Sequence, residues 1–273
     1  MVRERIEIVS GRARLVGERA GAGHRPSLVF LHAGVADRRG WSGATSALSG
    51  TFDTVAYDRR GFGETTGEPE PFSQVADLLA VLDVLALPTA WLIGSSEGGR
   101  IALDCALAHP SRVAGLVLVA PSVSGAVDHE EPSASANRLL ELIETAVTSG
   151  DLDAVNRHET ALWLDGPGGP VGRVGGSVRA LVMDMNRQAL GAPPPGPEIA
   201  PPDAFERLGE IAVPTLVIWG NLDLPGLQTR SATVARAVEH GRAQVMEGTA
   251  HLPYVEQPTA FADLVGSFVW EVG

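Results

Sequence analysis

Short apolar runs recur along the chain and predict the strands of a sheet. Five of them are nearly continuous: SLVFL (27–31), TVAY (54–57), AWLI (90–93), GLVLVA (115–120) and TLVIW (215–219). A continuous apolar run is typical of a strand that is covered on both faces. The segments 4–9 and 13–17 instead alternate apolar and polar residues, which predicts a half-buried antiparallel pair. The alternating stretch RAQVME (242–247) predicts the last strand.

Helical patterns lie between several of these strands. One apolar stripe has the i, i+3, i+4, i+7 spacing of a helix and consists of Val75, Leu78, Leu79, Leu82 and Leu85. Two further helices are expected over 98–108 and 258–272. Strand and helix alternate up to about residue 120 and again after about residue 213. This alternation predicts an α/β fold, in which a mostly parallel central sheet has helices on both faces.

The middle of the chain breaks this alternation. No convincing strand lies between 121 and 213, and two helical stripes occupy the segment: Leu139, Ile143, Ala146 and Val147, then Val178, Leu181, Val182, Met185 and Ala189. The stretches 166–176 and 192–202 are rich in glycine and proline and predict loops. We therefore expect a core made of 1–124 and 206–273, and an inserted helical lid over 125–205. A lid over a binding site is the preferred interpretation, because ligands of open α/β sheets bind where strands end. The alternative is a helical insertion that does not cover a binding site.

Charge and composition narrow the classes of partner. The 273 residues carry a formal net charge of -12, from 21 basic and 33 acidic side chains. This balance disfavours nucleic acid and anionic membrane surfaces as partners, because both need clustered Lys and Arg. The first residues contain no signal-peptide core, and no run approaches the length of a membrane span. We expect a cytoplasmic protein, monomer or homodimer, that acts on a small molecule.

The single cysteine, Cys105, excludes an intrachain disulfide. It lies in IALDCALA on a predicted helix, where a small buried hydrophobic side chain is the simplest interpretation.

The stretch IGSSEGGR (93–100) contains two adjacent serines between a predicted strand and a predicted helix. Ser96 has glycines two residues before and two residues after it, Gly94 and Gly98, whereas Ser95 does not. A sharp turn that projects one side chain needs small neighbours on both sides, because the backbones crowd there. The pattern predicts a nucleophile elbow with Ser96 at its tip; the alternative is a plain glycine turn.

A serine nucleophile needs a base, and the base needs an orienting acid. His251 follows the predicted last strand and precedes the final helix, so it is the preferred base. Asp223 follows the strand TLVIW and is the preferred acid, although a turn aspartate bonded to its own backbone is a common alternative. The order Ser96, Asp223, His251 belongs to one known arrangement of catalytic triads. His109 is expected to cap a helix, and His32 to be structural.

These pieces together resemble a lid-bearing member of the α/β-hydrolase superfamily. The matching stretches are VFLHAGVADRRGW, YDRRGFGE, WLIGSSEGGRIAL, RVAGLVLVAP, PTLVIWGNLDLP and GTAHLPYVEQP, which span nearly the whole chain except its middle. The resemblance implies Ser96 as nucleophile, Asp223 as acid and His251 as base. The HAG segment resembles the family's oxyanion stretch with Ala33 where glycine is usual. This makes the N–H of Gly34 the preferred oxyanion donor and Ala33 the second, beside the N–H of Glu97.

The nucleophile type narrows the chemistry that the resemblance implies. Haloalkane dehalogenases and epoxide hydrolases resemble this fold but carry aspartate at the elbow, so Ser96 excludes them. Serine suits hydrolysis of an ester or lactone, or of a thioester or amide, without a cofactor or metal. Cofactor-free C–C bond hydrolases, perhydrolases and hydroxynitrile-type lyases would use the same residues. A ligand-binding protein with little turnover is a further alternative.

The substrate is expected to be small to medium in size, neutral and largely apolar. Glu97 would disfavour anionic substrates, unless it pairs with an arginine such as Arg38 or Arg100 and only shapes the wall. Trp163, Leu162, Met183 and Met185 of the lid are expected to supply apolar lining, although such stripes are more often core. The residues predicted to contact substrate are Val35, Trp163, Met183, Met185, Leu224 and Leu252.

Overall fold

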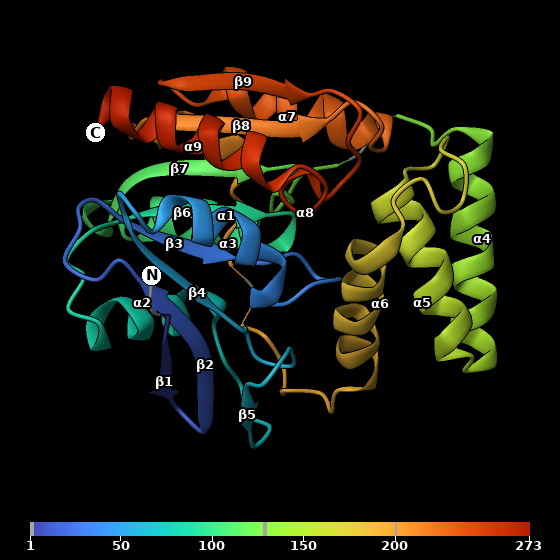
Figure 1. Cartoon of the computed structure of the whole chain (residues 1–273), viewed down its shortest axis with the longest axis horizontal. Coiled ribbons are helices and arrows are strands. Elements are labelled where there is room, and N and C mark those ends of the chain that lie inside the picture. Colours follow the sequence, from blue (N-terminus) through green and yellow to red (C-terminus); the bar gives the residue numbers. More distant parts are fainter. Residues whose placement is uncertain (1–2, 128–129, 200) are drawn as a thin grey trace.

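A single mixed sheet of nine strands organises the protein (Figure 1). The computed structural model describes residues 3–127, 130–199 and 201–273. The strands are β1 (Glu4–Ser10), β2 (Ala13–Ala20), β3 (Ser27–Leu31), β4 (Asp53–Tyr57), β5 (Thr66–Gly67), β6 (Ala90–Ser95), β7 (Val113–Val119), β8 (Thr215–Gly220) and β9 (Gly241–Met246). Their order is β1-β2-β4-β3-β6-β7-β8-β9, and β5 pairs with β2. All pairs from β4 to β9 are parallel, while β2 is antiparallel to β1, β4 and β5.

Helices cover both faces of this sheet. They are α1 (Ser42–Leu48), α2 (Gln74–Val84), α3 (Glu97–Ala108), α7 (Pro225–Ala237), α8 (Pro253–Glu256) and α9 (Pro258–Val272). Alternate residues of β3 show how the two cores form: Val29 and Leu31 pack with α2, α3 and α7, whereas Leu28 and Phe30 pack with α1 and α9. This division follows from the two-residue period of a strand. The predicted α/β architecture, a mostly parallel central sheet with helices on both faces, is confirmed.

Among the described residues between β7 and β8, three α-helices lie together at one end of the sheet (Figure 1). They are α4 (Ala134–Ser149), α5 (Leu152–Thr160) and α6 (Gly176–Gly191), and a π-helix (Ala161–Asp165) follows α5. Within residues 130–199 and 201–213, no strand is present, only an isolated bridge from Glu198 to Phe72. The helices lie within the segment 125–205, and the role of this segment as a lid stays a prediction.

Most element boundaries fall within a few residues of the expected ones. The short β5 and the π-helix have no periodic signal, because each is too short to show one. Cys105 is fully buried in the core, and burial raises the pKa of its thiol to about 12. His109 is the C-cap of α3, as predicted. No helix in the described part of the chain is both long and apolar enough to cross a membrane.

Candidate active site

Ser96 occupies a strained turn between β6 and α3. Its φ is 51° and its ψ is -112°, a conformation that non-glycine residues rarely adopt. A Cβ atom on Gly94 would overlap the carbonyl oxygen of Gly98, and one on Gly98 would overlap that of Leu31. The G-x-S-x-G spacing is therefore a steric requirement of this turn. The turn also separates the two serines, because Ser95 is fully buried whereas Ser96 is half-buried.

Asp223 and His251 form a buried hydrogen-bonded pair. The distance from Asp223 Oδ2 to His251 Nδ1 is 2.7 Å, and each residue is only 3% exposed. The other carboxylate oxygen, Oδ1, accepts the backbone N–H of Leu224 at 2.8 Å. A carboxylate accepts hydrogen bonds only, so the imidazole proton lies on Nδ1 and Nε2 remains free to act as a base.

The three predicted triad members lie at the same edge of the sheet. Ser96 follows β6, Asp223 follows β8 and His251 follows β9, and these strands are parallel. Asp223 and His251 are in direct contact, whereas the Ser96 hydroxyl has no hydrogen bond to any residue that the structure describes. Catalytic hydrogen bonds of this kind are often long before substrate binds. The assignment of Ser96 as the third member stays a prediction.

The preferred oxyanion donors are the backbone N–H groups of Gly34 and Glu97. Neither the N–H of Gly34 nor that of Glu97 donates to a residue within 3–127, 130–199 or 201–273. The segments are adjacent, because a Cβ atom on Gly34 would lie 3.4 Å from Glu97 Oε2. Glu97 is the first residue of α3, where N–H groups lack partners within the helix. Ala33 is only 1% exposed, which favours Gly34 as the second donor.

Glu97 is ionised and paired with two arginines. Its Oε2 accepts a hydrogen bond from Arg59 at 3.0 Å, and its Oε1 lies 3.6 Å from Arg100. Burial alone would raise the pKa of Glu97, but the charge and hydrogen bond of Arg59, with Arg100, bring it below its ordinary value. The expectation that Glu97 pairs with an arginine is confirmed, and Arg100 is one of the two that were named. Arg38 is not a partner, because its guanidinium instead binds the buried carboxylate of Asp58.

His32 is structural, as expected. Its Nε2 accepts the N–H of Arg59 at 3.0 Å, so its Nδ1 carries the proton and donates to the carbonyl of Ala33 at 2.8 Å. Burial and the nearby Arg59 charge lower its pKa well below 6.5. The ring is therefore neutral and holds the segment before Gly34 in place.

The residues predicted to contact substrate divide into two groups. Trp163 lies beside the candidate base: its ring centroid is 4.7 Å from that of His251, and its carbonyl accepts the His251 N–H at 3.1 Å. The other half-buried members are Val35, Met183 and Leu224. Met185 and Leu252 are 1% and 0% exposed within the apolar core. Almost no surface of these two side chains is accessible in this structure, and their contact with substrate stays a prediction.

Arg173 links the inserted segment to the His251 loop, and the sequence analysis missed it. Its guanidinium donates to the carbonyls of Asp165 and Gly248, each at 2.8 Å, and to Glu256 Oε2 at 2.5 Å. Glu256 Oε1 accepts the N–H of Ala250, the residue before His251, at 2.8 Å. The available signal was that Arg173 is the only charged residue in GPGGPVGRVGG.

Comparison with known proteins places this architecture in a family. A model described as "Alpha/beta hydrolase family" matches residues 28–264. The chain belongs to the alpha/beta hydrolase family. The prediction of an enzyme on this fold is thereby confirmed. Within the described residues, no group of three or more His, Cys, Asp or Glu is placed to hold a metal ion.

Individual relatives are named as esterases. The chain is 29% identical over 258 residues to the pimeloyl-[acyl-carrier protein] methyl ester esterase of Serratia marcescens, covering 91% of this chain and 95% of that protein. A protein of the same name from Vibrio atlanticus is 26% identical, covering 90% and 95%. A thermophilic esterase structure from Thermogutta terrifontis has a TM-score of 0.78 at 22% identity, covering 98% and 99%. At that identity the third likeness supports the fold alone.

Proposed function

We propose that this protein is a serine hydrolase that cleaves a small to medium, largely apolar ester or lactone through an acyl-enzyme on Ser96. One observation carries the proposal. The buried Asp223–His251 pair lies at the same sheet edge as the strained Ser96 turn. A buried carboxylate that fixes the tautomer of a histidine is what an activated serine needs.

The chemistry follows from the placement of these groups. The Ser96 Oγ attacks the substrate carbonyl while His251 Nε2 takes its proton. The N–H groups of Gly34 and Glu97 stabilise the oxyanion that develops, since they have no competing partner among the described residues. His251 then returns the proton to the departing alcohol. Water, deprotonated by His251, releases the acid and restores Ser96.

The surroundings of Ser96 support a neutral, apolar substrate. Trp163, Val35 and Leu224 are half-buried apolar residues near the candidate base, oxyanion segment and acid, respectively. Glu97 is balanced by two arginines, so its charge contributes less to selectivity than an unpaired carboxylate would. The relatives named as methyl ester esterases add support for ester cleavage. We further infer that the segment 125–205 covers the site as a lid, because its π-helix contacts the His251 loop.

Ester hydrolysis by wild type, Ser96→Ala and Ser95→Ala tests the proposal. p-Nitrophenyl esters from acetate to octanoate serve as substrates. Ser96→Ala should lower kcat/KM by about a thousandfold or more, as removal of a triad member does. Ser95→Ala is the matched control and should retain activity, because its side chain is buried at the end of β6.

A fluorophosphonate probe distinguishes a hydrolase from an inert binder. Wild type should take up one equivalent of the probe, and Ser96→Ala none. Wild type that neither labels nor hydrolyses any ester would overturn the proposal. Labelling without ester turnover would move the assignment to C–C cleavage or lyase chemistry, which product analysis separates.

A further inference from the structure

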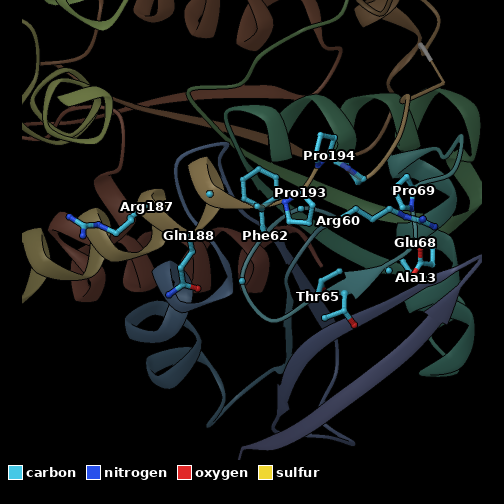
Figure 2. Close-up of a pocket in the computed structure, with 17 residues that line it drawn as sticks. Ala13, Arg60, Phe62, Thr65, Glu68, Pro69, Arg187, Gln188, Pro193 and Pro194 are labelled. Carbon is cyan, nitrogen blue, oxygen red and sulfur yellow. The ribbon is translucent and has the colours of Figure 1, made fainter. Parts of the chain in front are cut away.

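Two adjoining cavities lie beside the loop after β4. The outer cavity has a volume of about 560 Å³, and Figure 2 shows its lining. The other cavity has a volume of about 320 Å³. It is called the inner cavity because Glu97, the residue after Ser96, lines it, although it is the more open of the two. They share the stretches 60–62 and 192–195, and the inner cavity is also lined by Glu97. Both volumes lie in the range of small-molecule sites.

The shared wall is formed by a proline-rich segment that is fixed in place. The sequence APPP (192–195) has the stiffness of a polyproline conformation. The carbonyl of Pro195 accepts the N–H of Glu70 at 3.1 Å, and that of Pro197 accepts the N–H of Phe72 at 3.1 Å. The N–H of Ile199 returns a bond to the Phe72 carbonyl at 2.7 Å. These bonds anchor the segment, so the cavities exist before any ligand binds.

The lining is mainly apolar, and its two arginines already form ion pairs with carboxylates of the protein. Arg60 lines both cavities, but its guanidinium binds Asp77 at 2.8 Å and Glu70 at 2.7 Å. Arg187 of the outer cavity pairs with Asp153 at 3.1 Å. An uncharged chain therefore fits better than an anionic one.

The inner cavity adjoins the candidate active site through one of its lining residues, Glu97. Glu97 directly follows Ser96 in sequence, and its carboxylate lies beside Gly34. Phe62, which lines both cavities, has its ring centroid 4.8 Å from the ring of His32, at the start of the oxyanion segment. A ligand held at Ser96 has this cavity as a neighbouring space.

We propose that the two cavities form one channel, which receives the apolar arm of the ester substrate. This inference rests on the proposed function. The arm runs from the carbonyl held at Ser96, past Glu97 and Phe62, and along the prolines into the outer cavity. The arm is either the acyl chain or the alcohol chain, since both are apolar. In either case the protein prefers medium-chain esters, such as octanoates, over acetates of short alcohols.

Substitution of Ala192 tests this channel, because Ala192 lines both cavities. We compare wild type with Ala192→Trp and with Val147→Trp, a control on α4 where Val147 is 60% exposed and lines neither cavity. One series varies the acyl chain of p-nitrophenyl esters, and a second varies the alcohol of alkyl acetates. Wild-type kcat/KM should rise with chain length, by up to about fourfold for each methylene buried.

Ala192→Trp should lower kcat/KM at least tenfold on the longest members of one series, with acetates of short alcohols unchanged and the Val147→Trp profile like wild type. An unchanged profile, or an equal loss at every chain length, would overturn the channel. If Ala192→Trp does not fold, Thr66→Trp, which narrows only the outer cavity, should selectively impair the longest chains. Absence of Ser96-dependent hydrolysis on every ester would instead mark failure of the proposed function.

Discussion

Replacement of Arg173 by methionine is the sharpest test of how the inserted segment supports the site. The substitution removes the guanidinium that bridges the inserted segment, the carbonyl of Gly248 and Glu256. The Glu256 side chain is 4% exposed, and that of Arg173 is 19% exposed. The variant therefore leaves a buried carboxylate without its cation in α8, where Glu256 also accepts the N–H of Ala250 beside His251.

The expected loss of stability in Arg173→Met follows from the burial of this ion pair. Removing one partner of a buried ion pair costs about 3–5 kcal/mol. The lower end applies here, because Glu256 can take up a proton: burial already raises its pKa to about 7. A loss near about 3 kcal/mol corresponds to a Tm lower by about 6–12 °C for a chain of this size. kcat should fall more than KM rises, because the base is displaced while the apolar lining is retained.

We compare the thermal unfolding and the ester kinetics of Arg173→Met with those of a control, Arg187→Met. Arg187 also lies in the inserted segment and has a carboxylate partner, Asp153, but the two side chains are 63% and 65% exposed. An exposed pair contributes about 0–1 kcal/mol, so this control should unfold close to wild type. If Arg173→Met unfolds at the same temperature as Arg187→Met, the reasoning from burial is wrong.

Three further predictions concern the elbow, the acid and pH. Gly98→Ala should destabilise the protein and reduce kcat, because its Cβ would overlap the Leu31 carbonyl, whereas Gly50→Ala has open space and should be neutral in both assays. Asp223→Asn should lower kcat by about 10⁴ while the fold is retained by circular dichroism, because an amide no longer fixes the histidine tautomer. The pKa of Glu256 is raised to about 7 by burial, so the native state binds the extra proton and stability should fall as pH rises from 5 to 7. The free energy of unfolding, measured with urea at several pH values in this range, should depend less on pH for Glu256→Gln than for wild type. An unchanged pH dependence would contradict the assignment of this effect to Glu256.

Much of the fold could be read from local patterns. Apolar runs marked the central strands, since a strand covered on both faces has no polar alternation. The alternation of strand and helix then required the sheet to be mostly parallel, and the carboxyl ends of its strands to meet at one edge. The elbow was equally local, because the crowding at Gly94 and Gly98 arises within one turn and against the neighbouring strand.

Contacts between distant segments were decided by the tertiary structure alone. Glu97 pairs with Arg59 rather than Arg38, because Asp58 takes up the Arg38 side chain in the core. Met185 lies in an apolar stripe that was expected to supply pocket lining, but its side chain packs in the apolar core.

The site itself shows the same division. Sequence order and the positions after predicted strands indicated Asp223 and His251 as partners. Only the packing of β8 beside β9 brings their side chains to hydrogen-bonding distance. Arg173 had no periodic or motif signal, because its partners lie in other segments of the chain. A hydrophobic period or a steric clash within a turn depends on only a few neighbouring residues. For this reason the sequence by itself determined the strands and the elbow. Which charges meet, and which cavities remain, depends on how whole elements pack, and only the tertiary structure decided that.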